Sequence, residues 1–100
     1  ALGTELIRVV EELKKAGVKR IILFGSLAKD DIGIASDIDL LVVQETKKRF
    51  IERLVELYDI INPRYALDLL VYTQSEFDEM KEKNIFVKQI IREGKLLYEA

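Results

Sequence analysis

Two short apolar runs, residues 21–24 and 40–43, enclose a Gly-Ser pair and an Asp-x-Asp motif. Runs of four or five apolar residues are typical of strands that are buried on both faces of a sheet. Asp37 and Asp39 stand at the start of the second run, and alternate side chains of a strand share one face at a spacing of about 6.6 Å. Because two like charges repel at that spacing, the pair favours a cation between them.

A glycine and a serine end the first apolar run and predict a phosphate-binding turn. Gly25 would let the backbone approach a phosphate closely, and the Ser26 hydroxyl could bind it. Residues 27–29 are expected to open a short helix whose free N–H groups suit an anion, with Lys29 as a further candidate contact. The stretch therefore pairs a phosphate-binding turn with a metal site.

The composition excludes several kinds of chemistry. The 100 residues contain no cysteine and no histidine, which removes thiolates, disulfides, imidazole bases and the usual zinc ligands. A net charge of -2 gives no bulk basic field for nucleic acid. With 49% hydrophobic residues, no leader and no long apolar run, we expect one globular domain over residues 1–100, cytoplasmic and without membrane association.

Helical and extended patterns alternate along the chain. Thr4, Thr46 and Ser75 are the expected helix caps, and Gly17, Asn62 and Gly94 the expected stops. The second helix is expected to bury an apolar stripe of Phe50, Ile51, Leu54, Val55 and Tyr58. The expected elements are a helix up to residue 17, strand 20–24, loop 30–35, strand 38–44, a helix from 46 to 62, strand 65–72, a helix from 75 with Phe77 and Met80 buried, a helix burying Phe86, Val87, Ile90 and Ile91, and an edge strand at 96–98.

The positions of the polar residues predict the strand directions. Ser26 lies beyond the end of the first strand and Asp37 before the second, so they meet only if these strands are antiparallel. Asp68 lies near the start of the third strand and meets Asp39 if strands two and three are parallel neighbours, joined by a right-handed helical crossover. The fold class is therefore α/β, a small mixed sheet of three to four strands flanked by helices.

Aspartate is a poor strand residue, yet three aspartates occur in or beside the predicted strands. Asp37 alone could belong to a turn, and Asp39 and Asp68 could sit at solvated strand ends or pair with Arg or Lys. Taken together, the three favour a site for two Mg2+ ions about 3.5 to 4 Å apart that binds a nucleoside triphosphate. Asp68 would orient or help deprotonate an attacking hydroxyl, and attack on the α-phosphate would expel pyrophosphate.

Gly25-Ser26, ten further residues, Asp37-Ile38-Asp39 and a later strand with Asp68 resemble the minimal nucleotidyltransferase (MNT) branch of the DNA polymerase β superfamily. The resemblance covers nearly the whole chain. It implies catalytic and metal-binding roles for the three aspartates and phosphate binding for the Gly-Ser pair. It also implies transfer of a nucleoside monophosphate, AMP from ATP, to an acceptor hydroxyl.

Proteins of this branch commonly pair with a helical HEPN protein as antitoxin and toxin, and some adenylylate that partner on a tyrosine. The resemblance thus implies a HEPN-like partner, although homo-oligomers are also open. The competing hypothesis is a catalytically silent subunit that holds a nucleotide or neutralises a partner by contact alone.

The chain departs from the family motif Gly-Ser-x-Ala-Arg-Gly, since Lys29 and Asp30 occupy the last two places. Lysine keeps the positive charge without the bidentate fork of arginine, and Asp30 adds a negative charge near the expected triphosphate. Asp30 and Asp31 are interpreted as loop surface and Ser36 as a turn former. Residues 47–49, Lys-Lys-Arg, are either a solvated face or a contact for nucleic acid or protein.

Overall fold

The computed structural model describes residues 2–29 and 37–100. The predicted loop at 30–35, with Asp30 and Asp31, and Ser36 lie outside the described residues. The elements are α1 (Leu2–Lys15), β1 (Arg20–Phe24), the short 3-10 helix η1 (Leu27–Lys29), β2 (Ile38–Val43), α2 (Phe50–Ile61), β3 (Leu67–Tyr72), α3 (Gln74–Lys83), α4 (Ile85–Glu93) and β4 (Lys95–Glu99).

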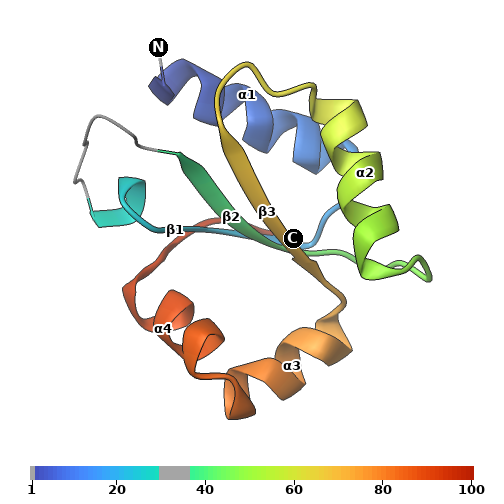
Figure 1. Ribbon diagram of the computed structural model, residues 1–100, viewed down its shortest axis with the longest axis vertical. Coiled ribbons are helices and arrows are strands. Elements are labelled where there is room, and N and C mark those ends of the chain that lie inside the picture. Colours follow the sequence, from blue (N-terminus) through green and yellow to red (C-terminus); the bar gives the residue numbers. More distant parts are fainter. Residues whose placement is uncertain (1, 30–36) are drawn as a thin grey trace.

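The four strands form one mixed sheet in the order β3-β2-β1-β4. Strand β1 runs antiparallel to β2 and to β4, and β2 runs parallel to β3. Helices α1 and α2 lie on one side of the sheet and α3 and α4 on the other (Figure 1). The predicted strand directions and the α/β fold class are confirmed, and the expected edge strand is β4.

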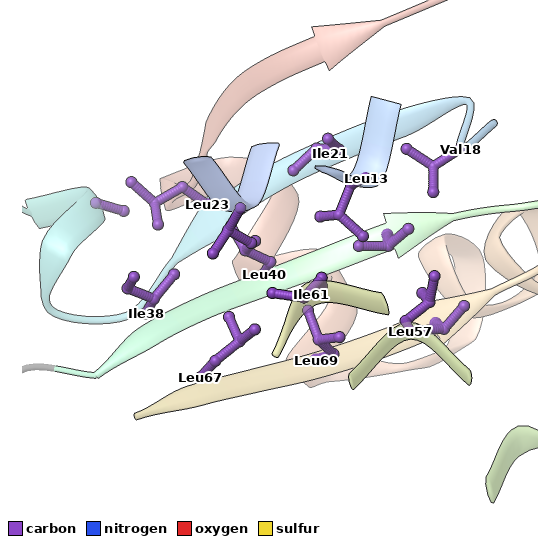
Figure 2. Packing of buried hydrophobic residues seen from close by; sticks show 14 residues of the cluster. Leu13, Val18, Ile21, Leu23, Ile38, Leu40, Leu57, Ile61, Leu67 and Leu69 are labelled. Carbon is purple, nitrogen blue, oxygen red and sulfur yellow. The ribbon is translucent and has the colours of Figure 1, made fainter. Parts of the chain in front are cut away.

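Alternating side chains divide the core between the two faces of the sheet. Figure 2 shows three neighbouring strands contributing pairs to one face, Ile21 with Leu23, Ile38 with Leu40, and Leu67 with Leu69. These residues pack with Val9 and Leu13 of α1 and Leu57 and Ile61 of α2. The opposite face packs on α3 and α4 through Ile22, Leu41, Val43, Phe77, Val87 and Ile90. Asp39 and Asp68 alternate with the residues that face α1 and α2, so they belong to the α3 and α4 side of the sheet.

Two of the predicted caps are wrong because other residues begin the helices. Helix α1 starts at Leu2, so Thr4 lies inside it. Helix α2 starts at Phe50 with Arg49 as its N-cap residue, and the Thr46 hydroxyl instead accepts a hydrogen bond from the backbone N–H of Lys48. Lys48 forms an ion pair with Glu56, as expected of a solvated basic stretch.

The third predicted cap, Ser75, is wrong by two positions. The Thr73 hydroxyl accepts from the Glu76 N–H at 3.2 Å, and the Glu76 carboxylate accepts from the Thr73 N–H at 2.9 Å. This reciprocal capping box fixes the start of α3 two residues earlier and places Ser75 in its first turn.

The predicted inward stripe of α2 is wrong at three of its five residues, whereas Leu54 and Tyr58 are partly buried against the core as expected. Phe50, Ile51 and Val55 are 36%, 67% and 64% exposed, and the buried positions are Arg53, Leu57 and Ile61. The helix is rotated relative to the apolar prediction because an arginine with its own partners occupies the inner face. In the last helix Val87 and Ile90 are buried as expected, whereas Phe86 and Ile91 are 51% and 43% exposed.

Strand limits differ from the predictions by one or two residues. Strand β2 ends at Val43 instead of residue 44, and β3 begins at Leu67 instead of residue 65. Within residues 2–29 and 37–100, no helix is long and apolar enough to cross a membrane.

Arg53 ties α2 to the outer edge of β3 and to α3. Its guanidinium donates to the carbonyl oxygens of Val71 and Lys48 at 3.1 and 2.8 Å and to both carboxylate oxygens of Glu76 at 2.6 and 3.1 Å. The residue is only 7% exposed, so its charge depends on these partners. The ion pair in turn holds the pKa of Glu76 below its usual value.

Replacement of Arg53 by methionine should lower the free energy of unfolding by about 2 to 4 kcal/mol, because it leaves two carbonyl groups without their donor and removes the guanidinium that pairs with the Glu76 carboxylate. Urea unfolding followed by circular dichroism measures this. Arg49→Met is the matched control, since that arginine is exposed, and should change the free energy by less than about 0.5 kcal/mol. Equal losses in the two variants would contradict the role of the buried network.

Candidate active site

Asp39 and Asp68 are direct partners in the parallel pairing of β2 and β3. Both lie at the second residue of their strands, where the strands begin, and both belong to the α3 and α4 side of the sheet. Asp39 is partly buried and Asp68 is exposed. The parallel register that the sequence predicted therefore brings these two carboxylates together at one end of the sheet.

Gly25 brings the backbone against the same carboxylate from the neighbouring strand. It follows β1 with a φ of +74°, in the left-handed region that favours glycine. A Cβ built on Gly25 would overlap Oδ2 of Asp39 and lie 3.2 Å from its Cγ. Glycine is thus required twice here, by the backbone angle and by the close approach of the Asp39 side chain.

The electrostatic state of Asp39 reflects its crowded surroundings. Burial, the hydrogen bond to Asp68 and the negative charges of Asp68 and Asp37 together raise the pKa of Asp39 to about 6. Each of these causes penalises the charged form, which is the usual situation of carboxylates that share a site. A cation placed between them would remove the penalty.

The structure brings some predicted site residues together and leaves others apart. Asp39 and Asp68 are in contact, and Asp37, just before β2, lies close enough for its charge to act on Asp39. In the part of the chain that the structure describes, no three acidic, histidine or cysteine side chains form a group that could hold a metal ion. The pair of carboxylates is therefore assembled, and the full set of three is not.

The residues present nevertheless fit a hard divalent cation in their chemistry. All three candidate ligands are carboxylates, the donor type that Mg2+ prefers, and a cation would neutralise the repulsion between their charges. The binding of Mg2+ by Asp37, Asp39 and Asp68 stays a prediction.

Ser26 and Lys29 lie in the turn that follows Gly25. Ser26 is exposed, and its carbonyl oxygen accepts from the Lys29 N–H at 3.1 Å, which closes the turn into η1. The ammonium of Lys29 lies 3.8 Å from a carboxylate oxygen of Glu93 on α4. Lys29 thus has a protein partner, and nucleotide binding by Ser26 and Lys29 stays a prediction.

A small pocket adjoins this turn. It has a volume of about 120 Å3 and extends from Gly25 to α4. The rings of Phe24 and Phe86 line it, packed edge to face with centroids 5.8 Å apart. Gly25, which lies against Asp39, is part of the lining, whereas Asp39 and Asp68 are not.

Tyr58 of α2 is a site neighbour that the sequence analysis missed. Its hydroxyl donates to the carbonyl oxygen of Leu67 at 2.7 Å and accepts from the N–H of Leu69 at 3.1 Å. Burial, and after it the charges of Asp68 and Asp39, raise the pKa of Tyr58 against the lowering effect of the Leu69 bond. The helical spacing of apolar residues predicted that the ring of Tyr58 faces the core. It did not predict the partners of the hydroxyl, because these depend on which strand lies next to α2.

Comparison with known proteins supports one family for the chain. The family model for polymerase beta nucleotidyltransferases matches residues 6–100. A curated protein of Methanocaldococcus jannaschii, named "Putative protein adenylyltransferase MJ0604", is 29% identical over 97 residues, which cover 94% of this chain and 92% of that protein.

Two solved structures share the fold. The first is described as a "putative nucleotidyltransferase from Sulfolobus solfataricus", with a TM-score of 0.68 and 22% identity over 96% of this chain and 78% of that one. The second is a chain of "the toxin-antitoxin with AMP-PNP", with a TM-score of 0.61 and 20% identity over 93% of this chain and 72% of that one. At these identities the similarity shows the fold alone. From the family match over residues 6–100, the chain belongs to the polymerase beta nucleotidyltransferase family.

Proposed function

We propose that this protein is a Mg2+-dependent adenylyltransferase that moves AMP from ATP to a hydroxyl group, a tyrosine of a HEPN-type toxin partner. The observation that carries the proposal is the contact of Asp39 with Asp68 beside Gly25, because it places two carboxylates and a close backbone approach at one end of the sheet. The family, the relative named as a protein adenylyltransferase and the structural neighbour from a toxin–antitoxin support it.

Each site residue has a role in the proposed reaction. Gly25 and Ser26 bind the β- and γ-phosphates through the backbone and the hydroxyl, and Lys29 exchanges its Glu93 partner for phosphate oxygen. Asp37, Asp39 and Asp68 are the residues that would hold Mg2+. When bound, the metal supplies positive charge that stabilises the phosphoryl oxygens during transfer.

The proposed transfer exchanges one bond of the α-phosphorus for another. The tyrosine oxygen of the partner forms a bond to the α-phosphorus, the bond from that phosphorus to the β-phosphate oxygen breaks, and pyrophosphate leaves. Asp68 orients the acceptor hydroxyl and accepts its proton. Since the chain itself forms no covalent bond to the nucleotide, its residues act through position and charge.

Labelled ATP tests the proposal. With Mg2+ and a helical toxin encoded beside this protein's gene, [α-32P]ATP should label the toxin and release pyrophosphate, and [γ-32P]ATP should leave the toxin unlabelled. Asp37→Asn/Asp39→Asn should abolish labelling, while Asp59→Asn, an exposed aspartate of α2, should keep it. Label from the γ-phosphate would show phosphorylation instead of adenylyl transfer.

The same variants separate catalysis from contact. If Asp37→Asn/Asp39→Asn neutralises the toxin in cells as fully as the wild-type protein does, this chain acts by masking its partner and the enzymatic proposal is wrong. Thermal stability gives a check without the partner. A hundredfold excess of Mg2+ and ATP over the dissociation constant should stabilise the wild-type protein by about 2.7 kcal/mol and leave the double variant unchanged.

A further inference from the structure

The outer edge of β3 is covered by side chains of α2. Strand β3 is the last strand of the sheet on its side, and its other edge pairs with β2. An uncovered edge would leave alternate N–H and C=O groups without a strand partner. Here the Val71 carbonyl accepts from Arg53, and the Leu67 carbonyl and the Leu69 N–H both bond the hydroxyl of Tyr58.

The two groups that Tyr58 bonds belong to the residues on either side of Asp68. A single hydroxyl therefore donates to the residue before Asp68 and accepts from the residue after it, at 2.7 and 3.1 Å. Such a bridge restrains both peptide groups that flank Asp68. Because Asp68 faces Asp39 across the register, the bridge also sets the position of the Asp68 carboxylate relative to Asp39.

We propose that Tyr58 is a positioning residue that holds Asp68 opposite Asp39 through the hydroxyl bridge across the backbone. The inference rests on the proposed adenylyl transfer and deepens it, since Asp68 is there the group that orients the acceptor hydroxyl. Stability alone does not require a tyrosine here, because water or another polar side chain could satisfy the same two backbone groups. The bridge instead restrains one catalytic carboxylate, where displacement of a fraction of an ångström matters.

Tyr58→Phe removes the hydroxyl and keeps the ring. We expect kcat for adenylyl transfer to fall about tenfold while KM for ATP stays unchanged, because the residues proposed to bind the triphosphate are not touched. The Mg2+ concentration that gives half-maximal activity should rise. Partial unfolding would also lower the apparent kcat at an unchanged KM, so kcat is calculated per folded protein, and the shift in Mg2+ dependence and the control variants identify the effect of the bridge.

Two control variants isolate the bridge. Tyr72→Phe removes a tyrosine hydroxyl from β3 itself, four residues beyond Asp68, where the centroid of the Tyr72 ring lies 5.9 Å from that of Phe50. Ile61→Val removes one methylene from the buried face of α2 and should lower the melting temperature by about as much as Tyr58→Phe does. Both controls should keep the wild-type kcat.

Nuclear magnetic resonance gives readouts that need no activity. In Tyr58→Phe, hydrogen exchange at the Leu69 amide should accelerate, and the three-bond couplings of Asp68 should show averaging between side-chain rotamers. Neither should change in Tyr72→Phe. Unchanged exchange at Leu69, unchanged Asp68 couplings or a wild-type kcat in Tyr58→Phe would each overturn the positioning role.

Failure of the proposed function gives a different result. If the wild-type protein transfers no nucleotide to the toxin, adenylyl transfer is wrong whatever Tyr58 does. The exchange and coupling measurements on Tyr58→Phe and Tyr72→Phe then decide on their own whether the hydroxyl positions Asp68.

Discussion

Asp39→Asn should abolish adenylyl transfer and at the same time raise the melting temperature of the metal-free protein at neutral pH. The wild-type carboxylate is crowded by Asp68 and Asp37, and its pKa is raised to about 6. Removing its negative charge therefore relieves a penalty that the folded protein carries. The two effects have one cause, because the charges that repel one another in the metal-free protein are those proposed to bind the cation.

The stability effect has a defined pH dependence. Since the pKa of Asp39 is higher in the folded protein than the ordinary value of 3.8, the folded state binds a proton more tightly than the unfolded state. The stabilisation from the protonated carboxyl is complete below about pH 4 and is lost as the pH rises through about 6. Asparagine does not titrate, so the gain from Asp39→Asn should be near zero at pH 4 and reach about 1 kcal/mol above pH 7, after a discount for solvent screening.

Thermal melts in EDTA from pH 4 to pH 8 measure this difference. Asp59→Asn serves as the control, since Asp59 is exposed on α2, and should show no such growth with pH. Adding Mg2+ should raise the melting temperature of the wild-type protein and leave Asp39→Asn unchanged. If Asp39→Asn is less stable than the wild-type protein at pH 8 in EDTA, the inference that Asp68 and Asp37 destabilise the charged form of Asp39 is wrong.

The strand topology and the meeting of the carboxylates could be predicted because few arrangements satisfy the sequence. Asp37 and Ser26 flank opposite strand ends, and Asp68 follows a stretch that is long enough for a helical crossover. Antiparallel pairing of β1 with β2 and parallel pairing of β2 with β3 bring these ends together, and the structure has both. The strand directions could therefore be predicted from the polar residues at the strand ends, on the assumption that these residues form one site.

The inner face of α2 could not be predicted, because a tertiary partner decides it. Apolar spacing favoured Phe50, Ile51 and Val55, yet all three are exposed, and Arg53 is buried beside Leu57 and Ile61. Only the folded arrangement supplies the Val71 carbonyl and the Glu76 carboxylate that make a buried guanidinium stable.

The hydroxyl of Tyr58 escaped prediction for a related reason. A tyrosine at helical spacing with apolar residues indicates a core position, and the ring does pack against the core of the α1 and α2 side. Its hydrogen bonds to Leu67 and Leu69 depend on β3 being the outermost strand, which the sequence left open. A side chain that acts by bonding the backbone beside another residue gives no recognisable sequence motif.

Gly25→Ala should reduce adenylyl transfer at least tenfold with only a moderate loss of stability. The alanine methyl group would stand at a φ of +74°, which costs about 1 to 2 kcal/mol, and it would overlap Oδ2 of Asp39. The overlapped atom is the end of a side chain that can rotate away, so the fold can accommodate the methyl group. The carboxylate that moves is the one proposed to hold Mg2+, and its displacement costs activity.

Gly17→Ala separates the two causes. Gly17 follows α1 with a φ of +87°, and a Cβ built there would have no heavy atom within 4 Å. Both variants should therefore lose about 1 to 2 kcal/mol in urea unfolding from the backbone angle alone. Only Gly25→Ala should lose transfer and the melting-temperature increase with Mg2+ and ATP. Full activity in Gly25→Ala would mean that Asp39 is not needed where the structure places it, and equal loss of activity in Gly17→Ala would assign the effect to destabilisation.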